Sequence, residues 1–353
     1  MKYLIVQDWE STHGNHAGMK HMCDLLSQIY PSEYKTIVNP APYRYPHDTI
    51  TEKIINKIKK IRDQKLTYPR QYLNLCKPWI DELNEHDEVF LLEYLYPEVP
   101  QYQLAKYIKK KTPLVKVYAL AHLTPLLFDT LFKNPQRLIT KWMKPVDKLL
   151  TLGTSLSLYM QNKKVAKDKI STGFHYVDTN YYKKSESTHF LNDSKLKVIA
   201  MGNLQRDFSL LSSIARKTPF IEWTICKGQK QVDDLFSSMQ NVKLLGYIEE
   251  DSLKEEMEKA DLSLNVLEDT VGSNVITTSI AMGLGIIVSD VGSIHDYCND
   301  GNAIFCQNNT DSFVNALQEL SQNPSRVMNM KQESLKIKER FDIIYIHKWF
   351  SSL

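Results

Sequence analysis

The stretch from Leu262 to Gly292 limits the fold of this chain more than any other part of the sequence. It begins with an apolar run, Leu262 to Val266, which predicts a buried strand. A glycine-containing acidic turn, Glu268 to Ser273, comes next, and a predicted helix closed by Gly283 follows it. A second apolar run, Ile286 to Val288, completes a strand–helix–strand unit of a parallel sheet. In such a unit, an anion binds where the first strand ends and the helix begins.

Similar units recur along both halves of the chain, because short apolar runs alternate with segments of helical spacing. Residues 170–195 lack this periodicity and separate the two series. We therefore expect an α/β protein with two doubly wound, Rossmann-like domains, at residues 1–180 and 181–335. The apolar segment 336–353 needs a surface to bury against, and we expect it to pack back on the first domain. A chain of 353 residues is long enough for two such cores.

The composition excludes several classes of protein. An apolar content of 42% with 24% charged residues is typical of soluble globular proteins. The sequence has no run of 18 or more apolar residues and no signal-peptide layout at its N-terminus, so we expect no membrane span. The five cysteines form no Cys-x-x-Cys pair, which favours a reduced, cytoplasmic protein and argues against zinc.

The charge is divided unevenly along the chain. Residues 1–180 contain 26 Lys and Arg against 18 Asp and Glu, whereas residues 181–353 contain 18 against 23. This asymmetry indicates that the halves meet different partners. A predicted basic helix at 51–65 could be an ordinary surface helix, or it could rest on an anionic membrane surface. We expect no nucleic-acid partner, because the basic residues form no compact patch with a known nucleic-acid-recognition motif.

Five short motifs occur in a fixed order. They are Ala119 to His122, Lys169 to Asp178, Met201 to Arg206, Asn241 to Gly246 and Ser273 to Gly292. Together they resemble the retaining glycosyltransferases of GT-B architecture, most closely the large family 4, in which two Rossmann-like domains face each other across a cleft.

The resemblance implies a reaction and its setting. A hexose-type sugar would pass from a nucleotide sugar, such as a UDP-sugar, to a saccharide or lipid-linked acceptor, with retention of configuration. The donor would bind the second domain and the acceptor the first, with no metal or other cofactor. The implied setting is the assembly of a surface polysaccharide or glycolipid in the cytoplasm, with peripheral contact to the inner face of the membrane as a further option.

The resemblance also assigns roles to single residues. Arg206, which follows a strand and Gly202, would neutralise the departing diphosphate, although such an arginine can also cap a surface loop. His122, at a strand end of the first half, would touch the transferred sugar or the acceptor, or else be satisfied within its loop. Tyr247 would lie near the nucleotide base, or simply be half-buried packing. The expected donor-binding residues are Gly14, His16, Gly202, Lys227, Tyr247, Thr270, Gly272, Ser273, Asn274, Val275 and Thr278.

The chain departs from the family at two carboxylates. The family motif has one glutamate that contacts the sugar and another that chelates the ribose hydroxyls. Counted back from Gly283, these positions are Thr270 and Thr278. A threonine hydroxyl forms hydrogen bonds, but it cannot form a charged bidentate one. Glu268 or Asp269, just before Thr270, could supply a carboxylate, and both are therefore candidate catalytic residues.

Two other functions are also consistent with the sequence. A non-catalytic partner protein of the same fold, which assists another transferase, would explain the loss of both glutamates. A sugar-nucleotide epimerase has the same two-domain shape, but it needs carboxylates as acid and base, which the first half does not clearly provide.

Overall fold

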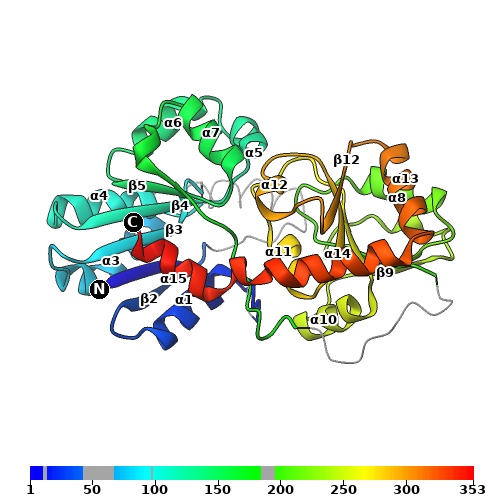
Figure 1. Cartoon of the computed structure of the whole chain (residues 1–353). Helices are drawn as coiled ribbons and strands as arrows, with labels where there is room; N and C mark the ends of the chain where they lie inside the picture. The colour runs from blue at the N-terminus through cyan, green and yellow to red at the C-terminus, as the bar shows by residue number, and fades with distance from the viewer. Residues whose placement is uncertain (11–13, 43–66, 97, 184–194) are drawn as a thin grey trace. The chain divides into compact units, whose positions relative to one another are not determined.

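The computed structural model describes residues 1–10, 14–42, 67–96, 98–183 and 195–353 (Figure 1). The basic helix predicted at 51–65 lies outside these residues. Within the described part of the chain, every helix is too short or too polar to cross a membrane.

The chain divides into two compact units. The first comprises Met1–His13, Gly18–Gly173 and Leu353, and the second comprises Gly14–Ala17 and Phe174–Ser352. A short piece of the first half thus belongs to the second unit. The packing of residues 336–353 on the first domain stays a prediction.

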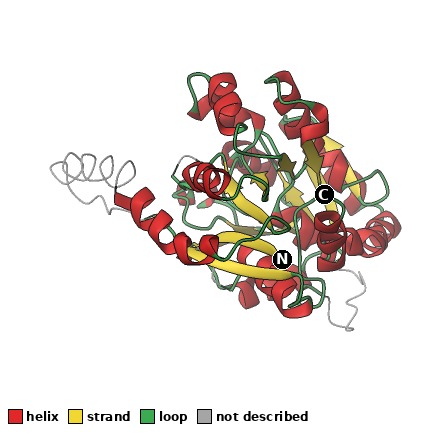
Figure 2. Cartoon of the chain, turned by 90° about the vertical axis from the view of Figure 1, so that its left-hand side faces the viewer, coloured by secondary structure: helices red, strands yellow, loops and turns green. Residues whose placement is uncertain are grey.

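The first unit is built on a six-stranded parallel sheet with the order β2-β1-β3-β4-β5-β6. Its strands are β1 (Lys2–Asp8), β2 (Tyr34–Pro40), β3 (Glu88–Tyr94), β4 (Lys116–Ala121), β5 (Lys148–Thr151) and β6 (Ile170–Thr172). Its α-helices are α1 (Met19–Ile29), α3 (Tyr68–Asp81), α4 (Gln101–Lys111), α5 (Pro125–Leu131), α6 (Pro135–Trp142) and α7 (Thr154–Asn162). Figure 2 shows strands and helices separately coloured.

The central strands of this sheet are buried on both faces. Leu4 and Ile5 of β1 and Phe90 and Leu91 of β3 are all 0% exposed, as expected for parallel strands covered by helices on each side. The order of strands reverses beside β1, because β2 pairs with one of its edges and β3 with the other. The carboxyl ends of β1 and β3 therefore form a topological switch point, where doubly wound sheets bind ligands.

The second unit repeats this architecture with the order β12-β11-β10-β7-β8-β9. Its strands are β7 (Lys197–Met201), β8 (Glu222–Cys226), β9 (Val242–Leu245), β10 (Leu262–Asn265), β11 (Gly285–Ser289) and β12 (Ala303–Cys306). Its α-helices are α8 (Phe208–Lys217), α9 (Asp233–Phe236), α10 (Glu250–Lys259), α11 (Asn274–Ala281), α12 (Ile294–Tyr297), α13 (Thr310–Ser321), α14 (Pro324–Ile337) and α15 (Ile343–Ser351).

The second sheet has an apolar cluster on each face. Alternate residues of one strand join different clusters: Val198 packs in one, and Ile199 packs in the other with α11. This alternation follows from the two-residue period of a strand. The order of strands reverses between β7 and β10, which pair directly, so the second switch point lies at their carboxyl ends.

Candidate functional site

Two loops meet at the switch point of the second unit. One follows β7 and carries Gly202 and Arg206, and the other follows β10. Arg206 and Leu267 form an isolated antiparallel bridge, and the N–H of Glu268 donates to the carbonyl of Gln205 at 3.1 Å. These backbone contacts hold the loop of Arg206 against the turn that leads into α11.

The Arg206 guanidinium has buried nitrogen atoms, although the residue as a whole is partly exposed. Its Nε and Nη1 atoms have no hydrogen-bond partner within the part of the chain that the structure describes. A Cβ on Gly202 would lie 3.4 Å from Nη2 of Arg206 and 3.1 Å from Cγ2 of Val275, so the guanidinium lies beside both residues. Burial lowers the pKa of Arg206 to about 10, which still leaves it charged at neutral pH. A buried, unpaired cation is costly, and an anion bound there would remove the cost.

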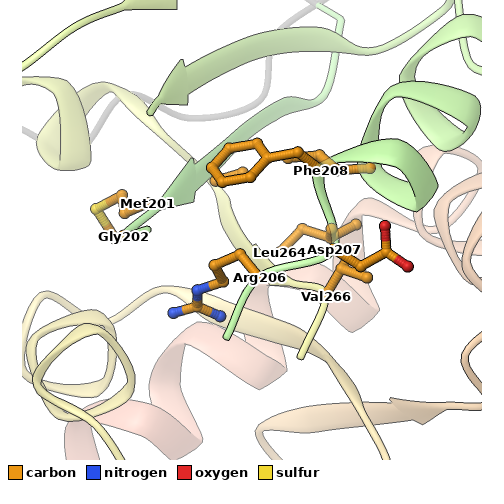
Figure 3. A pocket seen from close by; sticks show the side chains of 9 residues that line it. Met201, Gly202, Arg206, Asp207, Phe208, Leu264 and Val266 are labelled. Atoms are coloured by element: carbon orange, nitrogen blue, oxygen red, sulfur yellow. The ribbon is translucent and has the colours of Figure 1, made fainter. Parts of the chain in front are cut away.

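The neighbouring acidic residue does not neutralise Arg206. Figure 3 shows the guanidinium and the Asp207 carboxylate pointing in opposite directions. Asp207 instead caps α8, because its Oδ1 accepts from the N–H of Leu210 at 2.8 Å. A small cavity adjoins Arg206, and it is lined by Ala200, Met201, Gly202, Arg206, Asp207, Phe208, Leu211, Leu264 and Val266.

The N-terminus of α11 supplies further positive potential at this site. Ser273 is its N-cap, and the Ser273 hydroxyl accepts from the N–H of Ile276 at 3.4 Å. Asn274 and Val275 form the first turn and are partly exposed. Backbone N–H groups and the helix dipole at such a turn favour an anion. The structure thus brings together Gly202, Arg206 and Val275, three of the residues for which the sequence predicts a role at the donor.

Gly272, just before α11, is a glycine for two reasons. Its φ is +89°, and a Cβ there would lie only 2.0 Å from Cζ of Tyr297. The Tyr297 hydroxyl accepts from the N–H of His175 at 2.9 Å, and its ring stacks on Phe341 with centroids 5.4 Å apart. One buried ring therefore contacts the turn before α11, the segment that begins the second unit, and the C-terminal part of the chain. Nothing in the sequence singled out Tyr297.

The hydroxyls of the two threonines at the expected glutamate positions form hydrogen bonds with the backbone of nearby residues. Thr270 is 4% exposed, and its hydroxyl accepts from the N–H of Gly272 at 3.0 Å. Thr278 is 6% exposed, and its hydroxyl donates to the carbonyl of Val275 at 3.2 Å. These hydroxyls shape the turn and the first helical turn, and neither provides a charged group.

The two carboxylates proposed as substitutes are placed differently. Asp269 accepts from the N–H of Thr270 at 2.8 Å, and a Cβ on Gly292 would lie 2.7 Å from Asp269 Oδ1. Asp269 is thus part of the fold of the turn. Glu268 is exposed, while its backbone pairs with the loop of Arg206. Glu268 is the carboxylate here that a ligand can reach most directly.

Lys227 and Tyr247 lie along the same edge of the second sheet. Lys227 follows β8 and pairs with Asp233 at 2.9 Å, with only 12% of its own side chain exposed. It also donates to the carbonyl of Lys230 at 2.9 Å. Tyr247 follows β9 and is 60% exposed.

Gly14 and His16 belong to the short segment that packs within the second unit. His16 Nδ1 lies 2.7 Å from Oε2 of Glu250, the first residue of α10, and the His16 N–H donates to the same carboxylate. Its ring stacks on Tyr181 with centroids 3.7 Å apart. Glu250 therefore fixes this segment, a role that the sequence did not reveal, because 234 residues separate the two partners. A role of Gly14 and His16 in donor binding stays a prediction.

His122 belongs to the first unit, just after β4. Burial lowers the pKa of His122 to about 4, so its imidazole is neutral at physiological pH. The described residues contain no cluster of three or more His, Cys, Asp or Glu side chains arranged to hold a metal ion.

Two doubly wound parallel sheets of this kind are the architecture of the GT-B glycosyltransferases. Residues 208–323 match the family model described as "Glycosyl transferases group 1". This match lies within the second unit and agrees with the resemblance to GT-B glycosyltransferases, and the two six-stranded parallel sheets confirm the fold class expected from the sequence. A comparison of the sequence with curated proteins gives no match.

Several solved structures are similar to the whole chain. HepE from Anabaena, in complex with UDP and glucose, has a TM-score of 0.72 and 12% identity, over 99% of this chain and 100% of HepE. Sucrose-phosphate synthase from Thermosynechococcus elongatus has a TM-score of 0.71 and 9% identity, over 100% and 99% of the two chains. The lipopolysaccharide outer core galactosyltransferase WaaB, in its apo form, has a TM-score of 0.66 and 14% identity, over 100% of both chains.

Proposed function

We propose that this protein transfers a hexose-type sugar from a nucleotide-sugar donor to a saccharide or lipid-linked acceptor. The observation that supports this most is the Arg206 guanidinium beside Gly202 and the N-terminus of α11, because two of its nitrogens are buried with no hydrogen-bond partner among the described residues. A diphosphate bound there would meet a cation and helix amides at once. As the sugar departs, negative charge grows on the diphosphate, and fixed positive groups stabilise that charge. UDP in the complex of HepE, which has a similar fold, fits this assignment.

The proposed mechanism retains the configuration of the transferred sugar and uses no metal ion. Arg206 and the amides of Asn274 and Val275 provide the positive charge that a divalent cation would otherwise supply to the diphosphate. Glu268, which is exposed beside the loop of Arg206, is the carboxylate best placed to contact donor hydroxyls. Activity that is unchanged by EDTA is the expected result, and recovery of activity only with added Mg²⁺ or Mn²⁺ contradicts the metal-free proposal.

The decisive experiment is incubation with a panel of UDP-, GDP- and ADP-sugars, with release of nucleotide as the readout. For the accepted donor, Arg206→Ala should lower kcat by about 100-fold or more, the scale of losing one charge-stabilising group. Arg216→Ala is the matched control, because Arg216 lies exposed on the neighbouring helix α8. An effect of Arg206→Ala on kcat no larger than that of Arg216→Ala would mean that Arg206 does not contact the diphosphate.

One observation supports a second candidate function. Thr270 and Thr278 replace both expected glutamates, and their hydroxyls bond to the backbone. A non-catalytic partner protein of the same fold would need the donor cleft only for binding. Nucleotide binding without turnover of any donor in the panel would favour this candidate over the enzyme.

The proposed setting is the cytoplasm, with the first unit resting on the inner face of the membrane during polysaccharide or glycolipid assembly. The excess of Lys and Arg in residues 1–180 supports this contact. The protein should sediment with anionic phospholipid vesicles at low salt, and it should be released at high salt because the attraction is screened. Neutral vesicles are the control, and failure to sediment at low salt argues against membrane contact.

A further inference from the structure

The switch point of the first unit carries three side chains to which no role has been given. Trp9 directly follows β1, Glu93 lies near the carboxyl end of β3, and Tyr96 follows that strand. Because β1 and β3 are neighbours in the sheet, the three residues come from the two strand ends that flank the reversal of strand order. The corresponding position in the second unit is occupied by Arg206 and the turn before α11.

These side chains form one connected group. The Trp9 indole N–H donates to Oε1 of Glu93 at 2.7 Å. The rings of Trp9 and Tyr96 pack edge to face, with centroids 6.0 Å apart and an interplanar angle of 70°. All three residues are partly exposed. Oε2 of Glu93 is buried, and it has no hydrogen-bond partner among the residues for which the structure gives positions.

A chain of buried polar residues holds this group in place. The N–H of Glu93 donates to Oε1 of Gln101 at 3.0 Å, and Nε2 of Gln101 donates to Oε1 of Gln7 at 3.4 Å. Gln7 in turn donates to the hydroxyl of Tyr72 at 2.7 Å. Gln7, Gln101 and Tyr72 are each 0% exposed. Apolar side chains at these positions would avoid the cost of removing polar groups from water. Hydrogen-bonded polar side chains, by contrast, fix the positions of their neighbours.

The chemistry of the group suits a neutral, amphipathic ligand. Burial raises the pKa of Glu93 to about 8, so its carboxyl group is mostly protonated at neutral pH and adds little charge. The other two side chains, Trp9 and Tyr96, are themselves uncharged, in contrast to Arg206 at the second switch point. A pyranose ring has an apolar face that packs on indole and phenol rings, and hydroxyls that bond to polar groups at their rim.

We propose that Trp9 and Tyr96 form a saccharide-binding platform for the acceptor, and that Glu93 is a positioning residue that orients the Trp9 indole. This inference rests on the proposed sugar transfer, and it names an uncharged pyranose as the part of the acceptor that the first unit recognises. The switch point of the second unit then takes the anionic donor, and that of the first takes the neutral sugar.

The test measures binding of methyl glycosides of glucose, galactose, mannose and N-acetylglucosamine to the full chain by saturation-transfer difference NMR. Saturable binding of at least one glycoside, with a dissociation constant of about 1 mM, is expected. Trp9→Ala should weaken that binding about tenfold, the effect of losing one aromatic contact. Tyr345→Ala is the matched control, since Tyr345 is 46% exposed on α15 in the second unit.

The role of Glu93 is tested by a pair of variants. Glu93→Gln keeps an oxygen that can accept from the Trp9 indole and should leave glycoside binding within about twofold. Glu93→Leu removes the acceptor and should weaken binding about as much as Trp9→Ala. Binding of UDP to the same proteins is measured in parallel as a check of folding and of the donor site.

The outcomes separate this inference from the proposed function. Glycoside binding that is lost in Trp9→Ala while UDP binding persists supports the platform. Binding of no glycoside, or equal binding by Trp9→Ala and the parent, overturns it, whatever UDP does. Loss of glycoside binding in Glu93→Gln as well as Glu93→Leu refutes the positioning role, because the amide preserves the bond to Trp9. Failure of the parent protein to bind UDP would count against the donor site alone.

Discussion

Replacement of Gly272 by alanine tests how the turn before α11 is built. The added Cβ would lie 2.0 Å from Cζ of Tyr297 and 2.3 Å from its hydroxyl oxygen. The φ of +89° adds backbone strain of about 1–2 kcal/mol for a residue with a Cβ. Displacing a buried ring to relieve the overlap costs about 1–3 kcal/mol more. Gly272→Ala should therefore lower the free energy of unfolding by about 2–5 kcal/mol.

The control for backbone strain alone is Gly14→Ala. Gly14 has a φ of +75°, and a Cβ there would meet no heavy atom within 4 Å, so only about 1–2 kcal/mol should be lost. Urea unfolding followed by far-UV circular dichroism measures both variants. In the double variant Gly272→Ala/Tyr297→Ala, the overlap disappears, so its cost should fall below the sum of the single costs by about 1–3 kcal/mol. Equal costs for the two glycine variants, together with additivity in the double variant, would refute the contact.

Three further variants test charges in the protein. The pKa of His122 is lowered to about 4, so the buried neutral imidazole favours the folded state above the ordinary pKa of histidine, and this stabilisation is lost as pH falls toward 4. The Tm of His122→Gln should therefore fall less than the Tm of the parent between pH 7 and 4.5. Glu250→Ala should speed amide hydrogen exchange around His16 about tenfold or more, which mass spectrometry detects, because the carboxylate that holds this segment is gone. Asp233→Asn should tighten UDP binding up to about fivefold in titration calorimetry, because Lys227 loses a competing partner; unchanged affinity would mean that Lys227 does not bind the donor.

The strands of the second unit could be predicted closely from the sequence. The apolar runs at Leu262 to Val266 and Ile286 to Val288 correspond to β10 and β11, with ends that differ by one residue. Parallel strands buried on both faces are rich in apolar residues and easy to recognise, although β10 also buries Ser263 and Asn265. The edge strand β2 was missed, because its buried, intermediate and exposed residues follow no regular alternation and include Lys35, Asn39 and Pro40. The order of strands in each sheet depends on long-range pairing that local patterns do not contain.

The candidate site was predictable only where its parts follow a local pattern. Gly202 and Arg206 lie in the loop after a strand, and Val275 lies in the first turn of a helix, so their meeting at one sheet edge follows from the βαβ rule. The sequence could not show that Nε and Nη1 of Arg206 are buried and find no partner in the described part of the chain, since that depends on how the loops after β7 and β10 pair. It also could not show that the carboxylate of Asp269 accepts a hydrogen bond from the backbone of its own turn. The contacts of His16 and Tyr297 join segments far apart in the chain, and composition and periodicity carry no signal of them.

The assignment of Gly14–Ala17 to the second unit has a consequence for dissecting the protein. A recombinant fragment that starts at Phe174 would keep every strand of the second sheet but would lack this four-residue piece. Without Ala17, the apolar cluster around Ile276 and Ile280 would have a gap, and Glu250 would lose its hydrogen bonds with His16. Such a fragment should express as a less stable domain than the same residues in the full chain. Fusing residues 14–17 to this fragment through a short linker should restore the stability of the domain.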